Sequence, residues 1–165
     1  MFKQIQAAKE RLKGTVHVTP VMTSKTLNRW VNAEVFFKCE NFQRMGAFKI
    51  RGATNAILQL SEEERARGVI THSSGNFAAA LALAAKSLNT KAYIVMPSNA
   101  PAVKREAVAG YGAQIIECDP TLKSRESTTL SHQKKLGATF VHPSNDMNVI
   151  LGNSTAVWEL AKKAE

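Results

Sequence analysis

The sequence has little cysteine, few aromatic residues and no long apolar run, and each shortage excludes a class of protein. Only Cys39 and Cys118 occur in 165 residues, without a Cys-X-X-Cys pair, which argues against a disulfide framework or a zinc site. No apolar run approaches the roughly 18 residues that span a bilayer, and the first residues contain no apolar stretch typical of a secretory signal. We therefore expect a cytoplasmic protein with reduced thiols and no membrane association.

The charge is one-sided, with 22 Lys and Arg against 13 Asp and Glu and a formal net charge of +9. The basic residues are spread along the chain, and aromatic residues make up only 7% of it. This pattern is typical of solvated helix faces rather than of a groove that follows a phosphate backbone, so we expect no nucleic-acid partner. Hydrophobic residues make up 44%, which suffices for the core of one domain or two small ones.

From residue 68 onward, short β-branched segments alternate with helix-like segments. The predicted strands are residues 69–72, 92–96, 113–118 and 139–142. The predicted helices are residues 76–88, 102–109, 122–136 and 149–163. Strands that alternate with helices of this length indicate βαβ units on a parallel sheet, hence an α/β fold.

The chain before residue 68 has a less regular pattern. It predicts helices over residues 2–13, 25–31 and 49–60, a strand over residues 34–40, and an irregular segment around Thr19-Pro20. The charged residues 61–65 are interpreted as a surface connection into the second region. We expect the last helix to pack back on this first region.

Lys49 begins a predicted helix between the apolar side chains of Phe48 and Ile50, with a second cation at Arg51. Partial desolvation and a nearby like charge both favour a neutral amine, and a neutral amine can form a Schiff base. An ordinary solvated lysine at a turn is the plainer alternative, and these residues alone do not decide between the two.

Two polar turns follow predicted strands, where parallel sheets bind their ligands. One is Ser73-Ser74-Gly75-Asn76, whose hydroxyl and amide groups lie where a helix N-terminus offers free N–H groups to anions. The other begins with His142, which can act as an acid or a base. The plainer alternatives are simple helix capping at Ser74 or Asn76 and an inert, packed histidine.

Taken together, these segments resemble the serine/threonine dehydratase and serine racemase family, the fold-type II pyridoxal-phosphate enzymes. The resemblance covers nearly the whole chain and is carried, in order, by residues 19–24, 36–43, 48–53, 73–76, 111–113, 124–126 and 141–143. It implies that residues 68–145 form a small parallel-sheet domain inserted in a larger, truncated domain. Residues 1–67 and 146–165 would belong to that larger domain.

The resemblance also implies the cofactor, pyridoxal 5'-phosphate, and the residues that bind it. Lys49 corresponds to the lysine that holds the cofactor covalently and moves protons on one face of the substrate. Phe48 would flank the cofactor, and Asn76 would form a hydrogen bond with its 3-hydroxyl group.

Substrate binding is implied for the polar turn. Ser74 matches the serine that racemases use as the second acid/base, and Ser73, Ser74, Gly75 and Asn76 would bind the substrate carboxylate. The implied activity is that of an ammonia-lyase (dehydratase) on serine or threonine, or of a serine racemase, in amino-acid metabolism.

The chain departs from the family pattern at several positions. It has Ala47 where relatives usually have Ser, and Phe77-Ala78-Ala79-Ala80 where they usually have His-Gly-Gln-Ala. Ala79 therefore removes a polar group from the implied site. The family's Gly-Gln-Gly-Thr becomes residues 152–155, Gly-Asn-Ser-Thr.

Length is the largest departure, because family members are roughly twice as long as this chain. The glycine-rich loop that cups the cofactor phosphate and the family's divalent-metal ligands lie in the other half, and no two of the nine glycines here are adjacent. We therefore expect no metal site, weak cofactor binding, and either a homo-oligomer or a complementing C-terminal half. The alternative function is a non-catalytic remnant or interaction module that keeps the fold without the cofactor.

Overall fold

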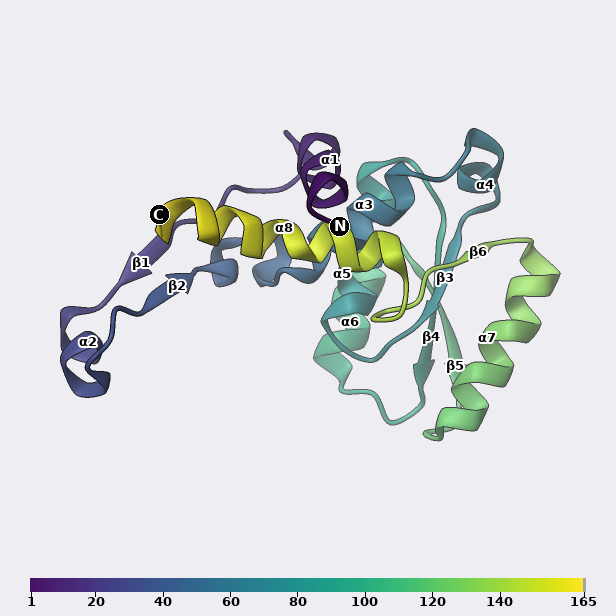
Figure 1. The fold of residues 1–165 in the computed structure, drawn as a ribbon. Helices are drawn as coiled ribbons and strands as arrows, with labels where there is room; N and C mark the ends of the chain where they lie inside the picture. The colour runs from purple at the N-terminus through teal and green to yellow at the C-terminus, as the bar shows by residue number, and fades with distance from the viewer. Residues whose placement is uncertain (165) are drawn as a thin grey trace.

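A four-stranded parallel sheet forms the centre of the molecule in the computed structural model, which describes residues 1–164 (Figure 1). Its strands are β3 (Val69–His72), β4 (Ala92–Pro97), β5 (Gln114–Cys118) and β6 (Thr139–Phe140), in the spatial order β5-β4-β3-β6. Every neighbouring pair is parallel, with Val69 opposite Ala92 and Thr139, and Tyr93 opposite Gln114. The parallel sheet predicted from the βα alternation is therefore confirmed.

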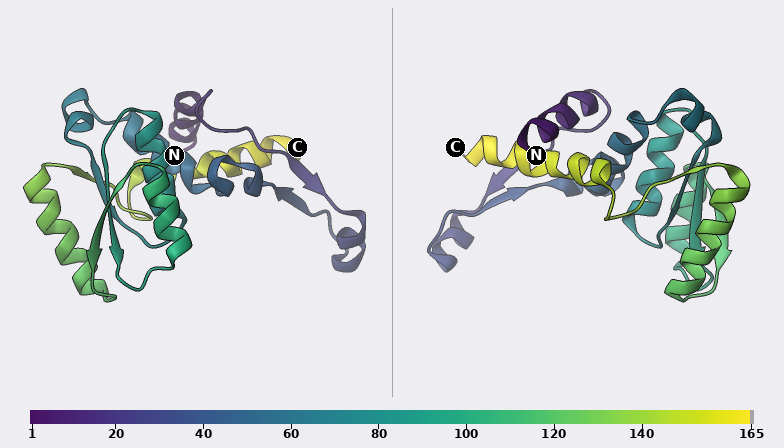
Figure 2. Two further views of the ribbon diagram at one scale, coloured as in Figure 1. Left: turned by 180° about the vertical axis from the view of Figure 1, so that it is seen from behind. Right: turned by 45° about the vertical axis from the view of Figure 1, so that its right-hand side comes forward.

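Helices cover both faces of this sheet, as Figure 2 shows. Helices α5 (Asn76–Ser87) and α6 (Ala102–Gly110) lie on one face, and α7 (Leu122–Leu136) lies on the other. Successive strand residues point to opposite faces. Ile94 accordingly joins the apolar cluster under α5, whereas its neighbour Val95 joins the cluster under α7.

Helix α3 (Lys49–Leu58) packs between α5 and the long C-terminal helix α8 (Met147–Ala164), while α1 (Phe2–Leu12) lies against α3 and α8. The backbones of α3 and α8 come very close where Gly52 meets Gly152. A Cβ atom added to Gly152 would lie 2.5 Å from the carbonyl oxygen of Arg51 and 2.7 Å from the Cα of Gly52. Only glycine fits this crossing, which sets the position of the helix that begins with Lys49.

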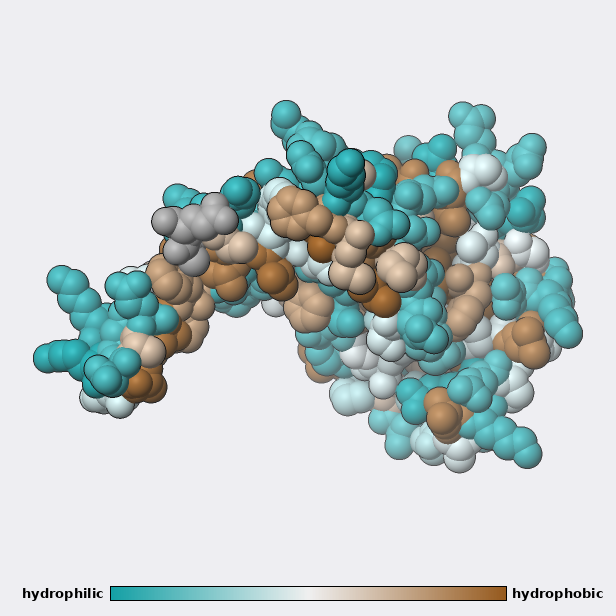
Figure 3. Space-filling view, in the orientation of Figure 1, coloured by the Kyte–Doolittle hydropathy of each residue, from teal (hydrophilic) through white to brown (hydrophobic). Residues whose placement is uncertain are grey.

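An arm extends from the α/β body at the side of α8 (Figure 1). It consists of strand β1 (Val21–Thr23), helix α2 (Lys25–Val31) and strand β2 (Phe36–Lys38), followed by the short 3-10 turns η1 (Glu40–Phe42) and η2 (Arg44–Gly46). The two strands pair antiparallel, and Ser24 caps α2 by accepting a hydrogen bond from the backbone N–H of Leu27. The arm carries exposed apolar side chains, which Figure 3 shows continuing toward α8.

Two elements differ from the sequence predictions. Residues 61–65, interpreted as a surface connection, begin helix α4 (Glu62–Arg67), because Ser61 and Glu64 form a reciprocal capping box. Strand β1 lies in the segment that was expected to be irregular. The division into residues 68–145 and a larger domain of residues 1–67 and 146–165 stays a prediction. None of the helices over residues 1–164 combines the length and apolar composition needed to cross a membrane.

Candidate active site

Three segments far apart in the sequence converge on the amine of Lys49. Its Nζ donates a hydrogen bond to the carbonyl oxygen of Pro143 at 3.2 Å, in the turn that follows β6. The same nitrogen lies 5.2 Å from the ring centroid of Phe48 and 6.0 Å from that of Phe77, in the first turn of α5. Both distances are within the range of a cation–π contact.

Phe48 and Lys49 line a groove of about 580 Å³ at the start of α3. Its opposite wall is α8, through Ile150, Asn153 and Val157. This volume lies within the range of small-molecule sites. The phenyl ring of Phe48 is half-exposed to this groove, so an aromatic face and a primary amine are both available to a ligand.

The polar turn lies at the carboxyl end of β3, as predicted. Its backbone is held at both ends, since Ser73 N–H donates to the carbonyl of Val95 at 3.2 Å and Gly75 N–H donates to Ser73 Oγ at 3.3 Å. The hydroxyl of Ser74 has no hydrogen-bond partner within residues 1–164, which leaves it free for a ligand. Phe77 directly continues this turn and brings it toward the amine of Lys49.

Asn76 lies on the other side of this turn. Its Oδ1 accepts a hydrogen bond from Lys104 Nζ at 3.3 Å. Gly75, Asn76, Lys104 and Tyr111 line a separate cavity of about 180 Å³. The structure therefore brings Phe48 and Lys49 into one groove, and it places Gly75 and Asn76 at a neighbouring cavity.

His142 faces His72 at the ends of β6 and β3, with ring centroids 5.7 Å apart. The backbone N–H groups of Ser144 and Asn145 donate to Nδ1 of His142 at 3.1 and 2.7 Å, so this nitrogen acts as an acceptor. Burial lowers the pKa of His72, and the nearby charges of His142 and Arg125 lower it further. The pair supports the turn that carries Pro143. Across residues 1–164, no group of three or more potential ligands of the His, Cys, Asp or Glu type could hold a metal ion.

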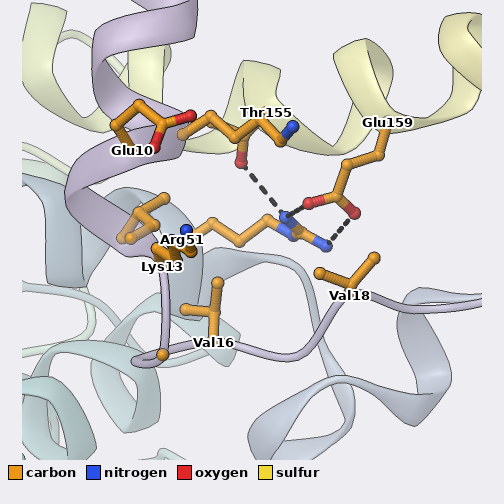
Figure 4. Close-up of a pocket in the computed structure, with 10 residues that line it drawn as sticks. Glu10, Lys13, Val16, Val18, Arg51, Thr155 and Glu159 are labelled. Carbon is orange, nitrogen blue, oxygen red and sulfur yellow. Dashed lines mark hydrogen bonds and ion pairs between the residues drawn. The ribbon is translucent and has the colours of Figure 1, made fainter.

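Arg51 is fully buried and has two carboxylate partners. It donates to Glu40 through Nε and Nη2, each at 2.8 Å, and to Glu159 through Nη1 and Nη2 at 2.8 and 2.9 Å. Figure 4 shows the contacts to Glu159 and Thr155 on α8, beside a cavity of about 260 Å³. Lys38 completes the cluster through an ion pair of 2.7 Å with Glu159. The second cation suggested beside Lys49 is therefore neutralised by two carboxylates.

The proton affinities of this cluster follow from its pairing. Burial disfavours the charged form of Glu40, but hydrogen bonds from Arg51 and Thr19 outweigh it and lower the pKa of that carboxyl. Burial likewise opposes the charge of Arg51, and the bonds to Glu40 and Glu159 outweigh it and raise the pKa of the guanidinium. Nothing in the spacing of these residues signals the cluster, because Arg51 and Glu159 are 108 positions apart.

Pyridoxal phosphate, the cofactor implied by the sequence resemblance, fits this site at its aldehyde end. Lys49 supplies the amine at the wall of the groove, and Phe48 supplies an aromatic face. The phosphate end has fewer partners, since the other lysine of the groove, Lys38, is bound to Glu159 and to the carbonyl of Thr19.

Comparisons with known proteins show which family this chain resembles. The chain is 45% identical over 164 residues to serine racemase of Dictyostelium discoideum, covering 99% of this chain and 51% of that protein. It is 46% identical to β-hydroxyaspartate dehydratase of Paracoccus denitrificans, covering 99% of this chain and 52% of that protein. The crystal structure of the D. discoideum serine racemase matches with a TM-score of 0.96 at 44% identity, covering 100% of this chain and 54% of that one.

The chain thus spans about half the length of the curated relatives it matches. A family model described as "Pyridoxal-phosphate dependent enzyme" matches residues 12–165, which is nearly the whole chain. The fold and this match lead to the same result: the chain belongs to the family of pyridoxal-phosphate dependent enzymes.

Proposed function

We propose that this chain corresponds to the N-terminal half of a pyridoxal-phosphate-dependent ammonia-lyase or racemase that acts on serine or threonine. The observation that carries the proposal is the amine of Lys49 at the wall of a small-molecule groove, held by Pro143 and the rings of Phe48 and Phe77. The cofactor, when bound, withdraws electrons from the Cα of an attached amino acid.

The chain's own residues have separate roles in holding the cofactor, moving protons and binding the substrate. Lys49 would hold the cofactor covalently before substrate binds, and its Nζ, once released by the substrate amine, would accept the Cα proton on one face of the substrate. Ser74, whose hydroxyl has no partner within residues 1–164, returns a proton on the opposite face if the reaction is a racemisation. Ser73, Gly75 and Asn76 form the loop that binds the substrate carboxylate, beside the N-terminus of α5, which has no side-chain cap. Phe48 covers the cofactor ring.

The second candidate is a non-catalytic interaction module. Two observations favour it. The groove is open along α8, where Val157 is 66% exposed, and Lys38 is paired with Glu159 rather than free for a phosphate. Both candidates share a fold, and they differ in whether Lys49 binds the cofactor.

Cofactor binding separates these candidates. The purified chain is mixed with pyridoxal phosphate, reduced with borohydride and mapped by mass spectrometry. The proposal expects the label on Lys49, its loss in Lys49→Ala, and its retention in Lys86→Ala, which removes an exposed lysine of α5. Labelling that is unchanged in Lys49→Ala would contradict the enzyme proposal, and absence of any specific label would favour the interaction module.

We also propose that the open side of the groove and the arm bind polypeptide equivalent to the second half of the relatives. Apolar side chains are exposed along this surface, namely Met22, Trp30, Phe37, Ile150 and Val157. The relatives contain about as much chain again beyond the matched part, which would cover this surface. A second copy of this chain is the alternative occupant.

The free thiols of Cys39 and Cys118 support a cytoplasmic location for this chain.

The occupant is tested by light scattering of this chain alone and after mixing with the recombinant second half of the D. discoideum serine racemase. A one-to-one complex that Val157→Glu abolishes supports the proposal. Val103→Glu is the matched control, because Val103 lies on α6 and is 67% exposed, against 66% for Val157. A homodimer that Val157→Glu dissociates would instead identify a second copy as the occupant.

A further inference from the structure

We propose that Phe77 is a positioning residue for Lys49. Together with Phe48 it places an aromatic ring within about 6 Å of the amine, which also donates a hydrogen bond to the carbonyl oxygen of Pro143. The inference rests on the proposed function in one respect, since Lys49 is the residue proposed to bind the cofactor.

The two rings differ in how firmly they are held. Phe48 directly precedes Lys49 and is 41% exposed, so few neighbouring atoms restrict the orientation of its ring. Phe77 is 3% exposed and lies in the apolar cluster that contains Ile50 and Leu81. Because Phe77 is fixed by the packing of α3 against α5, it provides the rigid reference for the amine.

The aromatic rings attract the ammonium group of Lys49 and so restrict its position. The face of an aromatic ring carries partial negative charge, so an ammonium group is attracted to it, and more strongly where water is excluded. A lysine side chain is flexible, and without such contacts its amine would sample many positions. Two rings and one carbonyl restrict the ammonium group to the wall of the groove before a ligand arrives. The amine is therefore already in place when it loses its proton and reacts, which is preorganisation of the reactive group.

Position 77 therefore has a role beyond filling the core. A purely structural role requires only an apolar side chain of similar size, which leucine provides. A positioning role requires the ring itself. Phe77→Leu separates these two roles, because it keeps most of the apolar volume and removes the aromatic face.

The experiment is NMR of the full chain after reductive methylation of its lysines with ¹³C-formaldehyde, which keeps each amine positively charged. The Lys49 signal is identified by its absence in Lys49→Arg. In the unsubstituted chain we expect this signal upfield of the other lysine signals, because ring currents of Phe48 and Phe77 shield it. In Phe77→Leu we expect it to move downfield toward the other lysines. The matched control is Phe2→Leu, whose ring packs against Trp158 of α8, and it should leave the Lys49 signal in place.

A Lys49 signal that coincides with the exposed lysines in the unsubstituted chain would overturn the inference, whether or not Phe77→Leu folds. A signal that is shifted upfield but unmoved in folded Phe77→Leu would assign the shielding to Phe48 alone and would also overturn it. Cofactor labelling of Lys49 is measured separately on unmethylated protein. Its failure with a normal NMR result would contradict the proposed function and leave the role of Phe77 standing.

Discussion

Replacement of Arg51 by methionine tests whether the buried ion cluster holds the arm, α3 and α8 together. Arg51 is fully buried, and the side chains of its partners Glu40 and Glu159 are only 14% and 9% exposed. Methionine keeps an unbranched apolar stem but removes the guanidinium. Two carboxylates then share the single positive charge of Lys38, and the cluster carries a net charge of −1 in a poorly solvated place.

The expected effect is large because a buried charge loses its partner. Removing one member of a buried ion pair destabilises a protein by about 3–5 kcal/mol. Total stabilities of small domains are roughly 5–15 kcal/mol, so this loss is a considerable part of the whole. With a urea dependence of roughly 2 kcal/mol per molar, the midpoint of unfolding should fall by about 2 M.

The control is the double variant Arg51→Met/Glu40→Gln, which leaves the ion pair of Lys38 with Glu159 and a cluster of zero net charge. It should be more stable than the single variant by about 0.5–3 kcal/mol, the range of coupling between residues in one network. Urea unfolding is followed by circular dichroism for the unsubstituted chain and both variants. A single variant within about 1 kcal/mol of the unsubstituted chain, or a double variant that is less stable than the single one, would refute this electrostatic account.

Three further outcomes are expected. Gly152→Ala should destabilise the chain by about 1–3 kcal/mol in the same urea assay, because its Cβ would strike the backbone of α3, whereas Gly110→Ala, where nothing lies within 4 Å, should be neutral or stabilising. Stability should decrease as the pH falls below about 6.5 toward the lowered pKa of His72, and again in acid as Glu40 with its lowered pKa takes up a proton; thermal melts at a series of pH values should show His72→Gln removing the first loss and Glu40→Gln the second. Ammonia release from serine should stay near background for the chain alone and rise when the second half of a relative is added; an ordinary rate of roughly 1–10³ per second from the chain alone would show that its site is complete.

The sequence predicts those helices and strands whose ends are determined by capping or turn residues next to them in the chain. Helix α7 begins and ends as expected, because the hydroxyl of Thr121 caps its first turn and Gly137 takes a left-handed conformation at its end. Strand β3 likewise follows from its β-branched run and the polar turn after it. The signal for α4 is also local, in the spacing of Ser61 and Glu64, but a run of charged residues is equally typical of a surface connection.

Contacts between distant segments could not be predicted in this way. Strand β1 has three residues and exists because it pairs with β2, which no local pattern shows. The carbonyl that accepts the hydrogen bond of Lys49 belongs to Pro143, 94 positions away. The resemblance indicated Lys49 and the polar turn as site residues, but it carried no information on Phe77, where this chain differs from the family pattern.

The first turn of α3 carries the candidate cofactor lysine, the buried arginine and the glycine that contacts α8. Residues 49, 51 and 52 point in different directions because successive helix positions are separated by about 100°. Lys49 therefore reaches the groove, Arg51 reaches Glu40 and Glu159, and Gly52 lies against the backbone of α8. Since the same turn serves all three contacts, a variant that loosens the Arg51 cluster or the Gly52 crossing should also misplace the amine. Folding stability and the position of the candidate cofactor lysine are thus set by neighbouring residues of a single helix.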